Sequence, residues 1–496
     1  MTKRQRSDDP SWWSLLRDDV VSNGGFVHSD LKFLEEDRAL TVAQKVLKGE
    51  VIFQIPERIF MTKDRALSMC KPWLENIITN DAPSGLWTNS TADIAIAVAM
   101  ASCRSSNEYR YLHSLPESST FDALPRRWSD HNIKKLLTGT SLLKHVISAK
   151  KGAINDYNNL LERYQKYLNG ADKAENTFPS FEKFSDMLAA VTSRAFQIGN
   201  TDQDVAIVPM LDLGDHTRGK STSKLGKKNV SYQYDASKHA MIVTSTVDID
   251  PEECIRLTYG AKANAQLLLN YGFCIPNNIE PDGSSNDILE FQANSKSISL
   301  RAGPKSYSYG GFVAALEEYF GPDDGAKECA SSMEKHEQNG IPSDFEDFLN
   351  ECENEEEDDD DYMGLYAGDD AELAAGDDSE TKDDYQDEIE VLQRFRFDLI
   401  KLSEAYNLAP TPPIGSGLAS SELYSKILCQ SELRTIAFFV CAIDKVQDLL
   451  YAEAKEDIKP EQKALDIVKD PDDLDMIEKQ TSELASAFMS IRHGIF

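Results

Sequence analysis

The chain has 496 residues, which is long enough for roughly two to four domains and a sizeable core. Hydrophobic residues make up 41% of it, as in a folded soluble protein with some disordered sequence, and the net charge of −32 argues against a nucleic-acid-binding surface. The longest apolar runs, Ile94–Cys103 and Ile436–Ile443, are too short to span a bilayer, so we expect no membrane segment.

The cysteines and the first residues bear on the compartment. The eight cysteines are widely spaced and form no C-x-x-C pair, so the sequence predicts neither a metal site nor a disulfide framework, and we expect reduced thiols. The first ten residues are basic and then acidic without an apolar core, which does not match a secretory signal. Lys3, Arg4 and Arg6 fit a weak nuclear signal, although a solvated terminus is the simpler interpretation. We expect a monomer in the cytoplasm or nucleus.

The N-terminal part alternates between short β and helical patterns. Residues 1–21 form a tail that leads into a helix, and two short strands, 39–43 and 51–56, are joined through a turn at Gly49. Residues 62–190 are predicted to be mostly helical, because apolar residues recur at three- and four-residue spacing. The clearest helical segments are 93–103, 129–137 and 142–167.

The middle of the chain returns to β patterns. Within residues 191–216, the apolar run 205–213 has the length of a strand and ends at the turn Gly214-Asp215-His216. Further strands are predicted over 230–234, 240–249 and 255–259. Residues 261–270 are good helix formers, and Tyr271 follows at the end of this helix, where Gly272 is a plausible C-cap.

The C-terminal part is predicted to be helical on both sides of an acidic tract. Residues 301–345 and 391–496 show helical periodicity. The most periodic segments are 389–406, 420–427 and 431–454, the last with a helix start at Ser431-Glu432. Residues 351–390 hold twenty acidic residues and one lysine, which predicts a disordered, solvated loop. An attraction for a basic protein is the alternative interpretation of this tract.

One pattern indicates a different chemistry. Residues 214–221 fit the phosphate-binding pattern G-x-x-x-x-G-K-[ST] and follow a predicted strand. Such a loop must open a helix, whose N-terminus holds the phosphates. The residues that follow, Thr222-Ser223-Lys224-Leu225-Gly226, lack apolar periodicity, so this context argues against a nucleotide site.

Five motifs occur in a characteristic order. They are Gly24-Gly25-Phe26-Val27-His28, Glu36-Asp37-Arg38-Ala39-Leu40, Ser193-Arg194-Ala195-Phe196, Asp212-Leu213-Gly214-Asp215-His216, and Tyr259-Gly260-Ala261-Lys262-Ala263-Asn264 with Leu267-Leu268-Leu269-Asn270-Tyr271-Gly272-Phe273. Together they resemble the SET domain of the Rubisco large-subunit methyltransferase-like class of protein methyltransferases. The resemblance is close over 22–300 and weak over 301–496.

The resemblance implies an α+β fold, in which a β-rich SET domain is split by a helical insertion and followed by an all-α domain. The implied parts are a tail (1–21), the N-terminal half of the SET domain (22–61), the helical insertion (62–190), the C-terminal half (191–300) and a helical substrate-binding domain (301–496) that contains the disordered insertion 351–390.

The resemblance also implies roles for individual residues. Tyr271 corresponds to the catalytic tyrosine, and Asp212 with Arg194 lies beside the substrate side chain. The residues that correspond to S-adenosylmethionine contacts are Glu36, Arg38, Ala39, Arg194, Asp215 and His216. This sequence departs from the family pattern in having Ala39 where glycine is usual and Asp215 where asparagine is usual. It also has no aromatic residue in Asn277–Asp287, where the family often has a tyrosine.

The implied activity is S-adenosylmethionine-dependent methylation of a protein side chain, with lysine of a non-histone protein as the first choice. The protein substrate would dock on the helical C-terminal domain. No metal is required, because the sulfonium group already carries the positive charge. Three alternatives stay open: histidine as the acceptor, a non-catalytic scaffold in which Ala39 and Asp215 have weakened cofactor binding, and a nucleotide-binding protein that uses 214–221.

Overall fold

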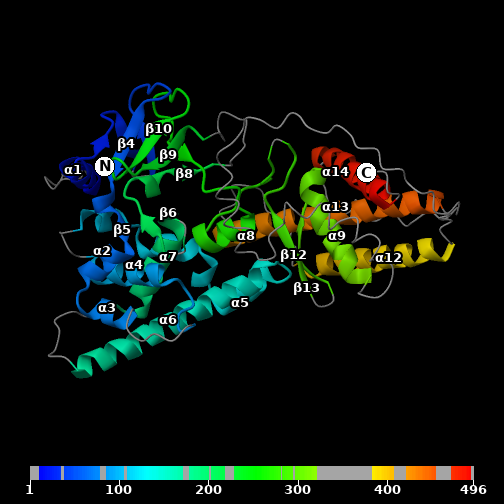
Figure 1. Ribbon diagram of the computed structural model, residues 1–496, viewed down its shortest axis with the longest axis horizontal. Helices are drawn as coiled ribbons and strands as arrows, with labels where there is room; N and C mark the ends of the chain where they lie inside the picture. The colour runs from blue at the N-terminus through cyan, green and yellow to red at the C-terminus, as the bar shows by residue number, and fades with distance from the viewer. Residues whose placement is uncertain are drawn as a thin grey trace, which may run out of the picture. The chain divides into compact units, whose positions relative to one another are not determined.

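A computed structural model of the chain describes two compact units, one formed by Met1–Ile133, Lys144–Tyr259 and Gln266–Phe273 and the other by Lys134–Leu143, Gly260–Ala265 and Cys274–Phe496 (Figure 1). The described residues are 11–34, 38–78, 85–104, 109–170, 178–199, 201, 203–217, 228–280, 282–293, 296–320, 382–406, 420–453 and 471–492. We refer to the two as the first and the second unit.

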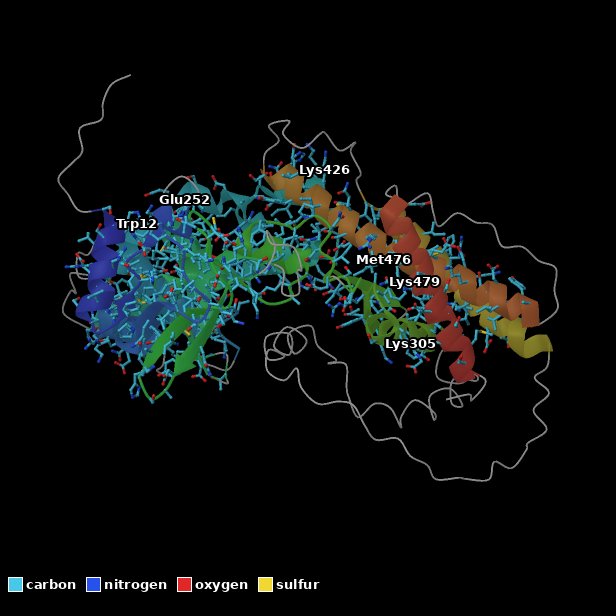
Figure 2. The ribbon with its side chains drawn as sticks, turned by 90° about the horizontal axis from the view of Figure 1, so that it is seen from above. Trp12, Glu252, Lys305, Lys426, Met476 and Lys479 are labelled. Atoms are coloured by element: carbon cyan, nitrogen blue, oxygen red, sulfur yellow. The ribbon has the colours of Figure 1, made fainter. Side chains whose placement is uncertain are left out.

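The first unit is built on an antiparallel sheet of four strands. The strands lie in the order β1 (Phe26–Val27), β4 (Val51–Pro56), β10 (Ala240–Ser245) and β9 (Val230–Asp235). Helix α1 (Trp12–Ser22) precedes the sheet and begins at Ser11, whose Oγ accepts a hydrogen bond from the backbone N–H of Ser14 at 3.3 Å. Trp12, labelled in Figure 2, packs edge-on against Phe33 with ring centroids 4.6 Å apart.

Three smaller β elements belong to the same unit. They are the hairpin β2 (Leu31–Leu34) with β3 (Ala39–Val42), the sheet β5 (Met61–Thr62), β7 (Val205–Ile207) and β6 (Ala195–Gln197), and the parallel pair β8 (Asp215–His216) with β11 (Arg256–Leu257). The pair β8–β11 joins segments about forty residues apart. Gly214 leaves room for the Leu257 side chain, because a Cβ at position 214 would meet Leu257 Cδ2 at 2.2 Å.

The helices between the two β regions bury the most apolar segment of the chain. Helix α4 (Thr91–Cys103) is capped by Ser90 and is buried on every side, as its nearly unbroken apolar sequence requires. It packs against α7 (Phe181–Arg194) and α2 (Lys63–Met69), which Figure 1 shows beside it. The remaining helices of this stretch are α3 (Trp73–Ile78), α5 (Asp130–Leu137) and α6 (Leu142–Gly170).

The second unit combines helices with one β-hairpin. Its elements are the hairpin β12 (Ile288–Ala293) with β13 (Lys296–Arg301), α9 (Lys305–Phe320), α12 (Lys382–Glu404), α13 (Ser420–Glu453) and α14 (Pro471–Arg492). Helix α13 packs against α12 and α14, and Met476 and Lys479 mark α14 in Figure 2. Phe312, Phe395 and Phe439 meet in the core. None of the helices in the described part of the chain is long and apolar enough to cross a membrane.

Several boundaries differ from the sequence-based expectations. The β pattern expected from residue 191 starts only at Ala195, since Val191–Arg194 is the last turn of α7. The strand expected over 205–213 stops at Ile207, because Pro209 has no N–H for a sheet and Met210 has a positive φ.

The C-terminal half differs in two places. The hairpin β12–β13 belongs to the second compact unit, which therefore is not purely helical. Of the acidic tract 351–390, expected to be a disordered loop, residues 382–390 form the first turns of α12, and 351–381 lie outside the described residues. Acidic side chains suit a helix N-terminus, because they complement the positive end of the helix dipole.

Candidate active site

A buried carboxylate with two donors forms the first part of the candidate site. Asp212 lies on the short 3₁₀ turn η5 (Leu211–Leu213), and its side chain is 1% exposed. Its Oδ2 accepts a hydrogen bond from the Tyr111 hydroxyl at 2.8 Å and another from Arg194 Nη1 at 3.0 Å. The same Nη1 donates to the backbone carbonyl of Asp212 at 2.9 Å. Asp212 Oδ1 is buried and has no hydrogen-bond partner among the described residues.

Burial and ion pairing together set the pKa values of the residues in this cluster. Burial raises the pKa of Asp212, and the positive charge of Arg194 opposes that shift. Burial by itself lowers the pKa of Arg194, but Asp212 and Tyr111 outweigh it, so this pKa is raised and the guanidinium stays charged. Burial, reinforced by the Asp212 carboxylate, raises the pKa of Tyr111 well above its ordinary value. The phenol is therefore a permanent hydrogen-bond donor to Asp212.

Arg38 contributes a second cation to this cluster. Its Nη2 donates to the backbone carbonyl of Ser114 at 2.9 Å. Burial, together with the nearby charge of Arg194, lowers the pKa of Arg38, while Asp212 raises it. Two arginines and one carboxylate thus share the site, which gives this cluster a positive net charge.

The backbone before Asp212 is strained. Met210, which is fully buried, has φ 73° and ψ −40°, close to a γ-turn that is rarely observed. A non-glycine residue in such a conformation costs on the order of 1–3 kcal/mol and persists only where its surroundings hold it. The tight turn brings both the backbone oxygen and the side chain of Asp212 to Arg194.

An aromatic stack forms the second part of the site. The ring of His216, on β8, stacks on Tyr259 at 4.8 Å, and Tyr259 stacks on Tyr271 at 4.9 Å, both with interplanar angles of 22°. Phe273 meets the Tyr271 ring nearly edge-on at 6.2 Å. Nδ1 of His216 accepts a hydrogen bond from the backbone N–H of Tyr259 at 2.9 Å, which places the proton of a neutral ring on Nε2.

Tyr259 connects the stack to the carboxylate cluster. Its hydroxyl donates to the backbone carbonyl of Gly214 at 2.8 Å. Burial raises the pKa of Tyr259, Tyr271 adds to the shift, and the charges of Arg194 and Asp212 also act on it. The two parts are thus close enough to influence each other electrostatically.

Tyr271 lies at the end of an unusual helical turn. The helix expected over 261–270 consists of α8 (Asn264–Gln266) followed by a π-helical turn, η6 (Leu267–Tyr271). Such turns are rare and occur frequently at functional sites. Gly272 ends the turn with φ 79°, and its N–H donates to the Leu268 carbonyl at 3.2 Å, as expected of a C-cap.

The structure therefore brings Arg38, Arg194, Asp212, His216 and Tyr271 together in the first unit. Asp215 is exposed on β8, beside His216. Ala39 lies in the extended backbone of β3, where it pairs with Leu34, and the positive φ of this region falls on Arg38 at 53°. Alanine is consequently not strained at position 39. Glu36 lies outside the described residues.

Two residues of the site, Tyr111 and Tyr259, were not among the site residues expected from the sequence. Tyr111 lies on the 3₁₀ turn η2 (Arg110–Ser114), in the stretch interpreted as helix packing. The signal that could have found it is the spacing Tyr111-x-x-x-Leu115-Pro116, which resembles a stretch typical of this class. Tyr259 opens the motif that ends in Tyr271, and its β-strand spacing concealed the contact with His216.

Two other expectations concern this region. Of the phosphate-loop pattern 214–221, residues 215 and 216 form β8, and 218–221 lie outside the described residues. In the described ranges, no group of three or more His, Cys, Asp or Glu side chains is placed to hold a metal ion.

The chain has detectable relatives among characterised proteins, although no family model matches it. It is 28% identical over 183 residues to the N-lysine methyltransferase setd6 of Danio rerio, a match that covers 34% of this chain and 37% of the relative. It is 23% identical over 257 residues to the Rubisco large subunit N-methyltransferase of Pisum sativum, with 49% and 46% covered. It is 22% identical over 249 residues to the actin-histidine N-methyltransferase of Danio rerio, with 50% and 39% covered. Each match spans less than half the length of the relative.

Solved structures resemble the chain over most of its length. The SET domain of LSMT bound to lysine and AdoHcy has a TM-score of 0.58 at 14% identity, covering 94% of this chain and 98% of that one. Rubisco LSMT bound to AdoMet has a TM-score of 0.56 at 15% identity, covering 89% and 93%. The predicted α+β fold, a SET domain with a helical C-terminal region, is thereby confirmed.

Proposed function

We propose that this chain is an S-adenosylmethionine-dependent protein methyltransferase whose acceptor is a lysine side chain of a protein substrate. The observation that carries the proposal is Asp212, a buried carboxylate with one oxygen held by Arg194 and Tyr111 and the other without a partner among the described residues. A buried acceptor of this kind fits the N–H of an incoming amine, because an unpaired buried oxygen is costly. All three relatives are named as N-methyltransferases, one of them of lysine and one of histidine, which supports the same chemistry.

The residues around the stack are suited to hold the cofactor. A neutral His216 ring carries its proton on Nε2, since its Nδ1 accepts from the backbone N–H of Tyr259. Asp215 offers an exposed carboxylate that can accept from an ammonium group, although it cannot donate as an amide would. Arg38 and Ala39 offer backbone groups at the start of β3. S-adenosylmethionine, when bound, supplies a methyl group on a positively charged sulfur.

The chain's own residues then have to orient the amine and favour its neutral form. Asp212 Oδ1 accepts one N–H and fixes the direction of the amine, while Arg194 and Tyr111 keep the carboxylate in place. The nearby cations Arg194 and Arg38 oppose the attraction of the Asp212 carboxylate for an ammonium ion, which favours the neutral form of the acceptor amine. We assign to the Tyr271 hydroxyl the role of orienting the reacting groups; its ring stacks on Tyr259, and Gly272 ends the turn that carries it.

Histidine is the second candidate acceptor. A carboxylate oxygen accepts from an imidazole N–H as well as from an amine, so Asp212 does not discriminate between them. The similarity to an actin-histidine methyltransferase supports histidine as the second candidate acceptor.

We also propose that the protein substrate docks on the helices of the second unit. Support comes from apolar side chains that these helices leave in solvent, Phe397 at 64% and Leu449 at 38% exposure.

The test is transfer of a labelled methyl group to a whole-cell protein extract, followed by acid hydrolysis and amino-acid analysis. We expect label in methyllysine with the wild-type protein and its loss with Asp212→Ala. Label in methylhistidine instead would show that the acceptor is histidine, the second candidate. Label that persists with Asp212→Ala would remove Asp212 from the role proposed for it.

A further inference from the structure

The loop that carries Tyr271 is closed at its base by one side chain. Asn264 is fully buried, and its Nδ2 donates to the backbone carbonyl of Ile275 at 3.0 Å. In the opposite direction, the backbone N–H of Ile275 donates to Asn264 Oδ1 at 2.7 Å. The amide thus satisfies both backbone groups of a residue that lies eleven positions further along the chain, and Tyr271 lies within the loop so formed.

Asp287 holds the asparagine in turn. Its Oδ1 accepts from the backbone N–H of Asn264 at 2.5 Å, and its Oδ2 accepts from Asn264 Nδ2 at 3.1 Å. Asp287 is 3% exposed, and Asn278 Nδ2 lies 3.4 Å from its Oδ1. Because the N–H of Asn264 is at the start of α8, the carboxylate also caps the helical segment that ends at Tyr271.

Few other side chains could make the hydrogen bonds that Asn264 makes. The asparagine amide donates and accepts with the same residue, so a side chain that only accepts or only donates cannot replace it. Asn264 and Asp287 are buried, and an unsatisfied buried polar group costs more free energy than a hydrogen bond contributes. The hydrogen bonds between Asn264 and Ile275 therefore fix both ends of the loop, and Tyr271 lies near its middle.

We propose that Asn264, anchored by Asp287, is a positioning residue for Tyr271: it closes the 264–275 loop and thereby sets the place of the tyrosine hydroxyl in methyl transfer. The role of the tyrosine rests on the proposed function, but the closure of the loop does not. A displacement of about 1 Å at a reacting group lowers a rate by about two orders of magnitude, so a loosened loop has a large kinetic effect.

The experiment compares Asn264→Ala with Asn286→Ala in the full chain. Asn286 is a matched control, because it is equally buried and donates to Glu280 and Asn278 at 2.7 and 3.2 Å without touching either end of the loop. Two readouts are used: hydrogen exchange of the amides in 266–273, and kcat with KM for labelled methyl transfer.

With Asn264→Ala we expect faster exchange of the 266–273 amides and a fall in kcat of about 10- to 100-fold, with KM for S-adenosylmethionine changed less than threefold. With Asn286→Ala we expect neither effect, even where the loss of thermal stability is similar. Unchanged exchange in Asn264→Ala would overturn the closure itself. Faster exchange with unchanged kcat would overturn the positioning role.

A wild-type protein that transfers no methyl group would refute the proposed function instead. The exchange comparison would still decide whether Asn264 closes the loop. A third variant, Asp287→Asn, should show a weaker form of the same exchange effect, since an amide retains only one of the two acceptors.

Discussion

Replacing Glu432 by glutamine should stabilise the protein at neutral pH. Glu432 lies in the middle of α13 and is 1% exposed. Its Oε1 accepts from the Ser141 hydroxyl at 2.5 Å, and its Oε2 accepts from the Tyr406 hydroxyl at 2.7 Å. Burial raises the pKa of Glu432 to about 7 despite these donors, and the charge of Asp287 adds to the shift. An amide can retain both contacts, because the Tyr406 oxygen can also accept.

The sign and size of the effect follow from linkage. The folded-state pKa of about 7 lies above the ordinary 4.5, so the folded protein holds a proton that the unfolded chain has released. The stability of the wild type therefore falls as the pH rises from 4.5 to 7. The total loss is about 3 kcal/mol, at about 1.4 kcal/mol per pH unit. Glutamine does not titrate, so the variant should gain this amount over the wild type at pH 8 and almost nothing at pH 4.5.

The assay is urea unfolding of the full chain at both pH values, followed by circular dichroism. All five tryptophans lie in the first unit, so tryptophan fluorescence in the same samples reports on that unit separately. Glu404→Gln, an exposed change on α12, is the matched control and should give no pH-dependent gain. If Glu432→Gln is no more stabilising at pH 8 than at pH 4.5, the reasoning from burial is refuted.

Three further predictions concern the first unit. Tyr271→Phe should lower methyl transfer at least 100-fold with cofactor affinity nearly intact, and unchanged turnover would remove this tyrosine from its role. Tyr111→Phe should cost about 1.5–3 kcal/mol of stability and raise KM for the protein substrate, because Asp212 loses a donor; thermal unfolding and kinetics check both effects. Gly272→Ala should cost about 1–2 kcal/mol, since alanine resists the positive φ and its Cβ would lie 3.1 Å from that of Ala123; an unchanged melting temperature would contradict this.

Local patterns in the sequence predict the regular parts of the fold well. The strand expected over 51–56 is β4, and the helix expected over 93–103 lies within α4. Gly272 is the C-cap that its position after a helix indicates. These elements depend on neighbours within a few residues, which a single sequence displays directly.

Features that depend on distant partners could not be predicted in the same way. Ser431-Glu432 suggested a helix start, but α13 is continuous from Ser420, and Glu432 is instead a buried acceptor for Ser141. The 205–213 run looked like a strand because its residues are apolar, whereas Pro209 and Met210 break it to place Asp212. Both cases depend on contacts that no local pattern encodes.

The candidate site shows the same division. The motifs placed Arg194, Asp212, His216 and Tyr271 in one region through the resemblance. Tyr111 contacts Asp212 across 101 residues of sequence, a distance over which periodicity carries no signal.

The most direct test of the proposed function is calorimetric titration of the purified protein with S-adenosylmethionine, with ATP–magnesium as the control. We expect binding of S-adenosylmethionine at micromolar strength and no binding of ATP. Binding of neither ligand would refute the proposed function and favour a non-catalytic scaffold, with Asp215 the first residue to examine. Binding of ATP alone would also refute it, in favour of a nucleotide site in the 214–221 loop.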